Sequence, residues 1–248
     1  MKDITIIGKS KAALNLAHYL DFIGIKYNLL EYRKSGKSQN IIKDSKIIFI
    51  LTRDDEIINF HNKNLDLIKG KKLYHFSGAL FHKNIVSLHP IISFSKKLLS
   101  KKDFEEIIFT SENPERIRKE LLWFKNKIIK IKPKDKPYYH CLLNILFNFP
   151  PLLFKSISDD LINKFNLPKE YIDKRLKDVI ERYIDDPEFV GGPLERGDRK
   201  TVAAHLKALS GKRLFYIYEG FLKYYHQKDK RYKVKRSKSK KLSSDCQS

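Results

Sequence analysis

Residues 3–24, "DITIIGKSKAALNLAHYLDFIG", decide the fold class of this chain. The first five residues are a short apolar strand candidate, and Gly8 follows them directly. Apolar residues then recur at helical spacing from Ala13 to Leu20, and Gly24 is a typical helix stop. A strand, a glycine turn and an amphipathic helix in this order predict the first half of a βαβ unit.

The same alternation continues through the first 132 residues. Further strands are predicted over residues 26–32, 46–52, 71–77, 84–89, 105–111 and 127–132, and helices over 54–68 and 113–126. The second of these helices has two start signals, because Asn113 can cap it and Pro114 occupies its first turn. Strands that alternate with helices predict a parallel α/β sheet.

The pattern changes at "PKDKP", residues 133–137, after which the periodicity is helical. Helices are predicted over residues 138–149, 151–166, 169–186, 199–209 and 212–228, and prolines separate the first three. We therefore divide the chain into an α/β domain over residues 1–133, an all-helical domain over 134–228 and a low-complexity basic tail over 229–248.

The length and composition exclude several classes of protein. The 248 residues, 42% of them hydrophobic, suffice for one large or two modest domains. No run of ~18 apolar residues occurs and no signal peptide is recognisable, so we expect no membrane association. Cys141 and Cys246 lie far apart in sequence, which favours neither a disulfide nor a metal site. The sequence predicts a cytoplasmic protein without a metal.

The formal net charge of +22 has an uneven origin. Of the 51 basic residues, 40 are lysines. Codon drift in an AT-rich genome produces such a bias without any acidic partner. Residues 223–241 carry ten Lys or Arg and one Asp, a net of +9. Such a tail is solvated and can hold polyanions without specificity, so we do not expect nucleic acid to be a specific partner.

The turn after the first strand is where a dinucleotide fingerprint, G-x-G-x-x-G/A, would lie. Gly8, Ser10 and Ala13 occupy its three positions. Gly8 can make the tight turn, and Ala13 is small enough for close packing of helix on strand. Ser10 replaces the glycine that lets the backbone approach a pyrophosphate, so its hydroxyl either bonds a phosphate or weakens the site. A tight turn with no ligand is the alternative.

The residues after the second strand bear on the choice of cofactor. Glu31 can accept a hydrogen bond from a ribose 2′-hydroxyl, which favours NAD. Arg33 and Lys34 can pair with a 2′-phosphate, which favours NADP. Arginine is rare in this chain, so Arg33 is the more informative residue. NADP is the predicted cofactor, and NAD stays possible.

Polar residues follow two of the later strands. "HFSGAL" contains His75, Ser77 and Gly78, and "SLHPIISF" contains His89. Ligands of open α/β sheets lie at the carboxyl ends of the strands. We therefore assign Ser77 and Gly78 to the cofactor and the two histidines to the cleft; histidines that merely cap strand ends are the alternative.

A polar stripe marks the start of the helical region. His140, Asn144 and Asn148 recur every four residues, on one helical face, and Lys136 stands where the helix begins. Such a stripe needs water or hydrogen-bond partners. Lys136 or His140 can donate a proton to a substrate carbonyl, with Asn144 or Asn148 orienting it. A hydrogen-bonded seam between domains, without chemistry, is the alternative.

Several motifs in this order resemble a known group. "TRDDEI", "HFSGAL", "SLHPIISF", "KPYYHCLLN" and, most specifically, "GGPLERGDRKTVAAHLKAL" over residues 191–209 are similar to bacterial Rossmann-like proteins with a helical C-terminal domain of unknown function. Those proteins are relatives of the ketopantoate, pyrroline-5-carboxylate and β-hydroxyacid reductases. The resemblance implies an α/β Rossmann-like N-terminal domain followed by an all-α domain that completes the cleft and a homodimer.

The resemblance also predicts structural roles for residues of the last motif. Gly191, Gly192 and Pro193 would fix a turn, Asp198 would cap the following helix, and Arg196 would project toward a cleft.

Three functions follow. The first is an NADP-dependent reductase that transfers hydride between nicotinamide and a small, anionic carbonyl, imine or hydroxy-acid substrate. The second is a nucleotide-binding or scaffolding protein without turnover. The third is a polyanion-binding protein that uses the basic tail.

Overall fold

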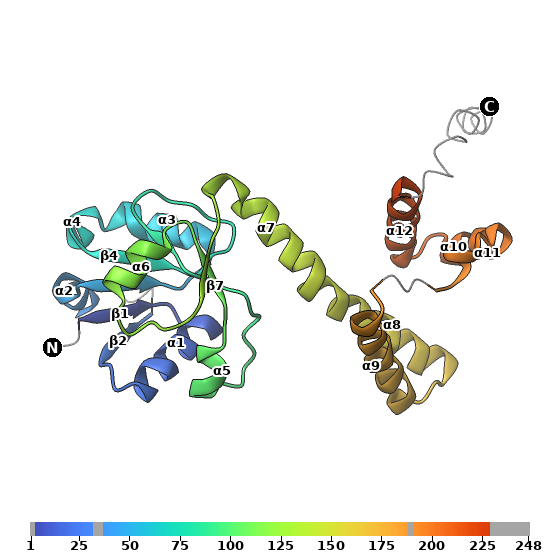
Figure 1. Ribbon diagram of the computed structural model, residues 1–248, viewed down its shortest axis with the longest axis horizontal. Coiled ribbons are helices and arrows are strands. Elements are labelled where there is room, and N and C mark those ends of the chain that lie inside the picture. Colours follow the sequence, from blue (N-terminus) through green and yellow to red (C-terminus); the bar gives the residue numbers. More distant parts are fainter. Residues whose placement is uncertain (1–2, 32–36, 188–190, 229–248) are drawn as a thin grey trace. The chain divides into compact units, whose positions relative to one another are not determined.

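A computed structural model describes residues 3–31, 37–187 and 191–228 (Figure 1). Arg33 and the basic tail, residues 229–248, lie outside the described residues. The chain divides into two compact units, Met1–Asp160 and Leu161–Ser248.

The first unit is built on a parallel five-stranded sheet in the order β2-β1-β3-β4-β5. Its strands are β1 (Ile4–Ile7), β2 (Tyr27–Leu30), β3 (Ile47–Ile50), β4 (Lys72–His75) and β5 (Val86–Ser87). The connecting helices are α1 (Lys11–Phe22), α2 (Lys37–Asp44), α3 (Asp54–Lys63) and α4 (Leu65–Ile68). The parallel α/β sheet predicted from the sequence is confirmed. The short α2 was not expected, because its apolar positions are few.

Both faces of the sheet are buried, and alternate residues of each strand face opposite ways. Ile6 and Phe49 belong to one apolar cluster, together with residues of α1, and Ile7 and Ile50 belong to the other, together with residues of α2, α3 and α4. Helices α1 and α3 thus cover opposite faces of the sheet (Figure 1). This burial on two sides explains why the strands read as continuous apolar runs in the sequence.

A second sheet of three strands extends the unit, in the order β6-β7-β8. It consists of β6 (His89–Pro90), β7 (Phe109–Ser111) and β8 (Ile128–Lys130), with helices α5 (Lys101–Glu105) and α6 (Pro114–Glu120) between them. β6 pairs with β7 in antiparallel register, so the expectation of parallel pairing throughout is wrong at this point. As predicted, the Asn113 side chain caps α6, accepting from the Arg116 amide at 3.1 Å.

One continuous helical stretch of 33 residues, Pro133–Phe165, follows the second sheet. It comprises a 3₁₀ turn (Pro133–Asp135), α7 (Lys136–Leu143), a π-helical turn (Asn144–Asn148) and α8 (Phe149–Phe165). The sequence predicted a break at Pro150 and Pro151, and this is wrong. A π turn lies directly before the two prolines, and a wider turn is one of the places where a helix accommodates missing amide donors.

This helical stretch also bears on the expectation that the chain has no segment able to span a membrane. By length and composition it is long and apolar enough to cross a bilayer, with a mean hydropathy of 1.3 over a window in which no residue is buried. The core helix of a soluble protein passes the same test of length and composition. The sequence argument missed it because it counted uninterrupted apolar residues and treated the prolines as an end.

Where the structure describes it, over residues 161–187 and 191–228, the second unit holds the end of α8 and four further helices. They are α9 (Lys169–Asp185), α10 (Pro193–Arg196), α11 (Arg199–Leu209) and α12 (Leu214–Lys228). The all-helical character predicted beyond residue 133 is confirmed. The sequence changes character at residue 133, whereas the first compact unit continues to Asp160. It does so because the first turns of α7 pack against the strand ends of the first unit.

Two glycines with positive φ provide a test of the turn after β1. A Cβ at Gly8, φ +113°, would lie 2.6 Å from the Leu51 carbonyl oxygen, whereas a Cβ at Gly24, φ +69°, would meet nothing within 4 Å. We expect Gly8→Ala to lower the free energy of unfolding by about 3 kcal/mol, from strain and overlap together. Gly24→Ala should cost about 1 kcal/mol, from the backbone alone. Urea denaturation followed by circular dichroism measures both, and equal losses would contradict the close approach at Gly8.

Candidate functional site

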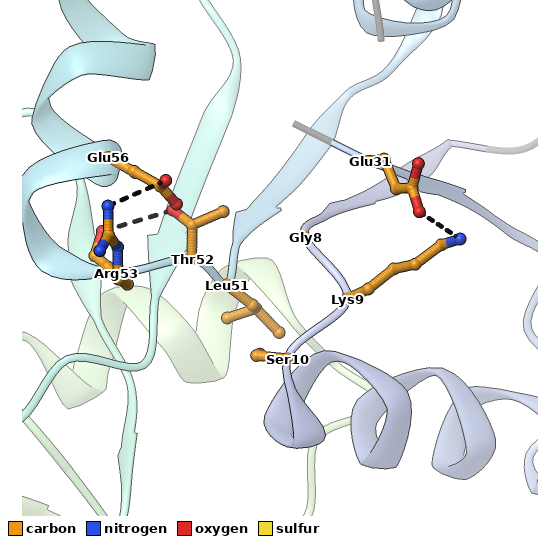
Figure 2. A pocket seen from close by; sticks show the side chains of 8 residues that line it. All are labelled: Gly8, Lys9, Ser10, Glu31, Leu51, Thr52, Arg53 and Glu56. Atoms are coloured by element: carbon orange, nitrogen blue, oxygen red, sulfur yellow. Dashed lines mark hydrogen bonds and ion pairs between the residues drawn. The ribbon is translucent and has the colours of Figure 1, made fainter. Parts of the chain in front are cut away.

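One pocket lies at the carboxyl ends of β1, β2 and β3 (Figure 2). We call it the Gly8 pocket; its volume is about 420 Å³, and it is lined by Gly8, Lys9, Ser10, Glu31, Leu51, Thr52, Arg53 and Glu56. In the strand order 2-1-3-4-5, the chain reverses its direction of winding between β1 and β3. Such a switch point is where open α/β sheets bind their ligands.

The turn at Gly8 is closed by backbone contacts. The Gly8 amide donates to the Leu30 carbonyl at 2.8 Å, and the Leu51 amide donates to the Ile7 carbonyl at 2.8 Å. These bonds draw three strand ends together, and the positive φ of Gly8 lets the chain leave the sheet within one residue. The tight turn predicted at Gly8 is therefore present.

Ser10 is the N-cap of α1. Its backbone is extended, with φ −64°, and its Oγ accepts from the Ala13 amide at 3.2 Å. The serine therefore needs no glycine-like conformation, and its own hydroxyl proton is left for a further acceptor. Ala13 is fully buried in the apolar cluster, as its predicted packing role requires.

Two cations flank the mouth of the Gly8 pocket, and the sequence argument did not select either. Figure 2 shows Lys9 facing Glu31 across one side of the turn and Arg53 facing Glu56 on the other. The Lys9 ammonium lies 2.6 Å from Glu31, and an Arg53 guanidinium nitrogen lies 3.4 Å from Glu56. What could have identified them in the sequence is their position, since each lies within three residues of the end of a strand.

The second pocket lies between the segment that starts at β6 and the long helix. We call it the His89 pocket; its volume is about 330 Å³, and its lining is His89, Pro90, Ile91, Ile92, Ser93, His140, Leu143, Asn144, Phe147 and Asn148. All three members of the predicted polar stripe line this one pocket. The stripe therefore faces the first unit's own strand ends.

A chain of hydrogen bonds joins the stripe. The Ser93 hydroxyl donates to Asn148 Oδ1 at 2.8 Å, and Asn148 Nδ2 donates to Asn144 Oδ1 at 2.7 Å. Asn144 Nδ2 in turn contacts the His140 carbonyl at 2.8 Å and His140 Nε2 at 3.4 Å. Both amide hydrogens of Asn144 are thus directed at His140, so Asn144 orients that histidine.

Gly78 allows the imidazoles of His89 and His140 to pack together as one wall of the pocket. A Cβ at Gly78 would lie 2.5 Å from His140 Cδ2 and 2.8 Å from His89 Nε2. The two imidazole rings, with centroids 5.4 Å apart, therefore close over a backbone position that admits no side chain. Gly78, which the sequence assigned to the cofactor, contacts the two histidines of the His89 pocket and is not among the residues that line the Gly8 pocket.

His75 and Ser77 lie behind this wall. His75 is fully buried, and its Nδ1 accepts from the Ser77 amide at 3.1 Å. Its Nε2 is buried without a partner among the described residues. Burial, followed by the nearby charge of Lys136, lowers the pKa of His75 to about 3. The Ser77 hydroxyl donates to Asp54 at 2.7 Å, which ties this loop to the start of α3.

Lys136 is buried, with 1% of its surface exposed. Its ammonium donates to Ser87 Oγ at 2.7 Å and lies 3.8 Å from Glu112. Glu112 also accepts from the Ser87 amide at 2.9 Å and, in a short bond, from the Ser87 hydroxyl. Burial lowers the pKa of Lys136, and Glu112 partly restores it. The sequence argument missed Ser87 and Glu112, although a serine inside an apolar strand and an acid directly after one were visible.

The Arg-Gly-Asp element lies in the second unit and differs from its expected geometry. Gly197, φ +72°, makes the turn between α10 and α11. Asp198 holds the N-cap position of α11, but its side chain makes no capping bond. Its carboxylate instead accepts from Arg196 Nε and Nη2 at 3.0 and 2.7 Å. Arg196 therefore folds back onto its own turn, because the two side chains are only two residues apart.

Metal ligation finds no support in the part of the chain that the structure describes. Within residues 3–31, 37–187 and 191–228, no three His, Cys, Asp or Glu side chains are grouped so that they could hold an ion.

The sequence and the fold were both compared with known proteins. Residues 110–225 match the profile of a domain of unknown function, DUF2520. Among curated proteins, none has a matching sequence.

Several solved structures are similar to the whole fold. A candidate NADP oxidoreductase from Bacteroides fragilis has a TM-score of 0.67 at 18% identity, over 90% of this chain and 97% of that one. A protein from Thermotoga maritima has a TM-score of 0.60 at 19% identity, over 90% of this chain and 97% of that one. An imine reductase from Myxococcus stipitatus, solved with NADP⁺, has a TM-score of 0.60 at 13% identity, over 90% of this chain and 93% of that one.

Identities this low establish the fold alone. The first unit has the switch-point topology of a Rossmann-like sheet, and a helical region follows it. The chain therefore has a Rossmann-like fold followed by a helical region, and its residues 110–225 are similar to the domain of unknown function DUF2520.

Proposed function

We propose that this protein is an NADP-dependent reductase that transfers hydride between nicotinamide and a small carbonyl, imine or hydroxy compound. The observation that carries the proposal is the Gly8 pocket, where a glycine turn and the N-terminus of a 12-residue helix meet at the switch point of the sheet. A helix N-terminus favours a phosphate group through its free amides and its dipole. Similar folds include reductases that were solved with NADP bound.

In this proposal the two pockets have different roles. Gly8, Ser10 and Lys9 hold the pyrophosphate, and Arg33, after β2, pairs with the 2′-phosphate. The nicotinamide end of the cofactor extends toward the His89 pocket, which binds the substrate. His140 lines that pocket and is the proposed proton donor. Lys136 is a buried neighbour that anchors the helix carrying His140.

Cofactor binding is tested by titrating the full chain with NADPH and NADH at physiological salt, with pyrophosphate as competitor. We expect saturable NADPH binding that excess pyrophosphate does not mimic. Arg33→Ala should weaken NADPH binding about tenfold or more and NADH binding far less, since one charge-assisted bond to phosphate contributes about 1.5–3 kcal/mol.

Lys46→Ala is the matched control for loss of one positive charge. Lys46 pairs with Asp3 at 3.0 Å, beside the amino end of β3 and thus at the opposite edge of the sheet. It should leave both affinities unchanged. If NADPH binds no more tightly than pyrophosphate, Ser10 has closed the site and the reductase proposal fails.

The proton donor is tested by turnover of NADPH with small carbonyl compounds. His140→Gln should lower turnover roughly 10²–10⁴-fold, the usual loss for a general acid. The comparison is the double variant Lys136→Met/Glu112→Gln, which removes the buried pair without leaving a single charge. If turnover falls strongly in the double variant and stays unchanged in His140→Gln, the proton donor is Lys136 and not His140.

A nucleotide-binding protein without turnover is the alternative, and Ser10 in place of the second glycine is what favours it. Such a protein would bind NADPH and leave it unconsumed with every carbonyl compound offered.

We also propose that the protein is a homodimer joined along its long helix. Exposed apolar side chains follow this helix, among them Tyr138, Leu142, Leu146, Phe149 and Leu152. Its opposite face packs on the first unit through the His89 pocket, and the helix also carries Lys155, Asp159 and Asp160. A bilayer would have to accommodate those polar groups, whereas a second copy of the same helix covers only the apolar face.

The dimer is tested by sedimentation of the purified chain. Leu146→Lys, at a leucine that is 57% exposed on the long helix, should shift the protein toward monomer. Leu122→Lys makes the same change at a leucine that is 74% exposed just after α6, and it should have no effect. A monomeric wild type, or one that requires detergent, would contradict the dimer.

A further inference from the structure

We propose that the His89 pocket binds an uncharged ligand through a carbonyl or hydroxyl oxygen, which accepts from Nε2–H of His89. Thr110 and Tyr139 are the positioning residues that hold His89 in the tautomer required. The inference rests on the proposed function only in taking this ligand to be the reductase's substrate.

The tautomer follows from two hydrogen bonds in series. The Thr110 hydroxyl donates to the Tyr139 oxygen at 3.2 Å. The Tyr139 proton is then directed at His89 Nδ1, whose distance to the Tyr139 oxygen is 3.2 Å. A neutral imidazole that accepts at Nδ1 carries its proton at Nε2. His89 lines the pocket, and in this tautomer its Nε2 carries the proton that the proposal directs to the ligand.

His89 stays neutral in this environment. Burial is the main cause that lowers its pKa, to about 3, and the nearby charges of His140 and Lys136 act in the same direction. Burial also raises the pKa of Tyr139, so the tyrosine keeps the proton that it donates. At neutral pH His89 and Tyr139 are thus both neutral.

A second donor lies in the same pocket. One amide hydrogen of Asn148 is directed at Asn144, and its oxygen accepts from Ser93. The other hydrogen of Nδ2 is left for a ligand. Asn148 is therefore a further N–H donor in the lining of the pocket, on the side formed by the long helix.

The rest of the lining opposes a charged ligand. Among the residues that the structure describes, no Lys, Arg, Asp or Glu lines the pocket, and the buried ammonium of Lys136 is already paired with Ser87 and Glu112. Burial of a carboxylate without a counter-ion is costly, whereas a carbonyl oxygen needs only hydrogen bonds. The apolar remainder, which includes Ile91, Leu143 and Phe147, fits a small hydrocarbon group.

This inference departs from the anionic substrate expected from the sequence. That expectation came from lysines summed over the whole chain and from Arg196, which the structure pairs with Asp198. A long-range positive field increases the encounter rate of anions, but the groups that line a pocket decide what is bound there.

The tautomer is tested by ¹⁵N NMR of the histidine side chains, with His89→Gln to assign the signal. We expect a protonated Nε2 and an unprotonated Nδ1 in the wild type. Tyr139→Phe should lower the fraction with protonated Nε2, and Thr110→Val is a second variant that perturbs the same chain. Tyr138→Phe changes the same group on the exposed neighbour and should have no effect. A wild type with the proton at Nδ1 overturns the proposal.

Ligand class is tested with two probes of one ring size, cyclopentanone and cyclopentanecarboxylate. Cyclopentanone should shift the His89 Nε2 signal saturably and bind about tenfold or more tightly than the carboxylate. Tyr139→Phe should weaken that binding about threefold to tenfold, as loss of one hydrogen bond would. Equal or tighter binding of the carboxylate overturns the proposal, and so does absence of any shift with either probe.

These measurements need neither cofactor nor turnover. Failure of the NADPH titration would therefore leave the result at His89 standing, and failure at His89 would leave cofactor binding standing.

Discussion

The buried contact of Lys136 with Ser87 and Glu112 is the constraint on which the arrangement of the candidate site depends. It joins the first turn of the long helix to β5 and to the residue after β7, three segments that are distant in sequence. Removal of one partner from such a pair costs about 3–5 kcal/mol, because the other charge is left buried. Since Lys136 fixes where the helix begins, it also fixes where His140, Asn144 and Asn148 lie relative to β6.

The two pockets form from the same edge of the sheet for a geometric reason. Parallel strands end at one edge, and the loops that follow them must turn there. At β1 the turn is as tight as a single glycine allows, which leaves the amides of α1 accessible. The segments that follow β4 and β5 instead form a site in which imidazole rings lie next to Gly78 and next to the long helix. In the proposed function, this edge of the sheet binds phosphate at the Gly8 pocket and presents uncharged donors to the substrate at the His89 pocket.

The long helix serves two surfaces with different chemistry. Its polar stripe is satisfied within the first unit by Ser93 and by bonds among its own members. Its apolar side chains are exposed in the single chain, and the π turn before Pro150 and Pro151 lets the helix continue past two residues without amide donors. The proposed second copy would cover that apolar surface, while the stripe would remain with the substrate pocket.

The sequence by itself determined the fold class, most strand positions, the cap at Asn113, and the common face of His140, Asn144 and Asn148. These follow from periodicity and from turn chemistry, which act between residues that are close in the chain. The tertiary structure alone decided the antiparallel turn at β6, the burial of Lys136 against Ser87 and Glu112, and the tautomer of His89 set by Thr110 and Tyr139. It also decided that Arg196 binds Asp198 and that the prolines do not end the helix. Each of these depends on which side chains meet across the fold or on how the backbone relaxes locally, and neither is visible in the spacing of residue types along the chain.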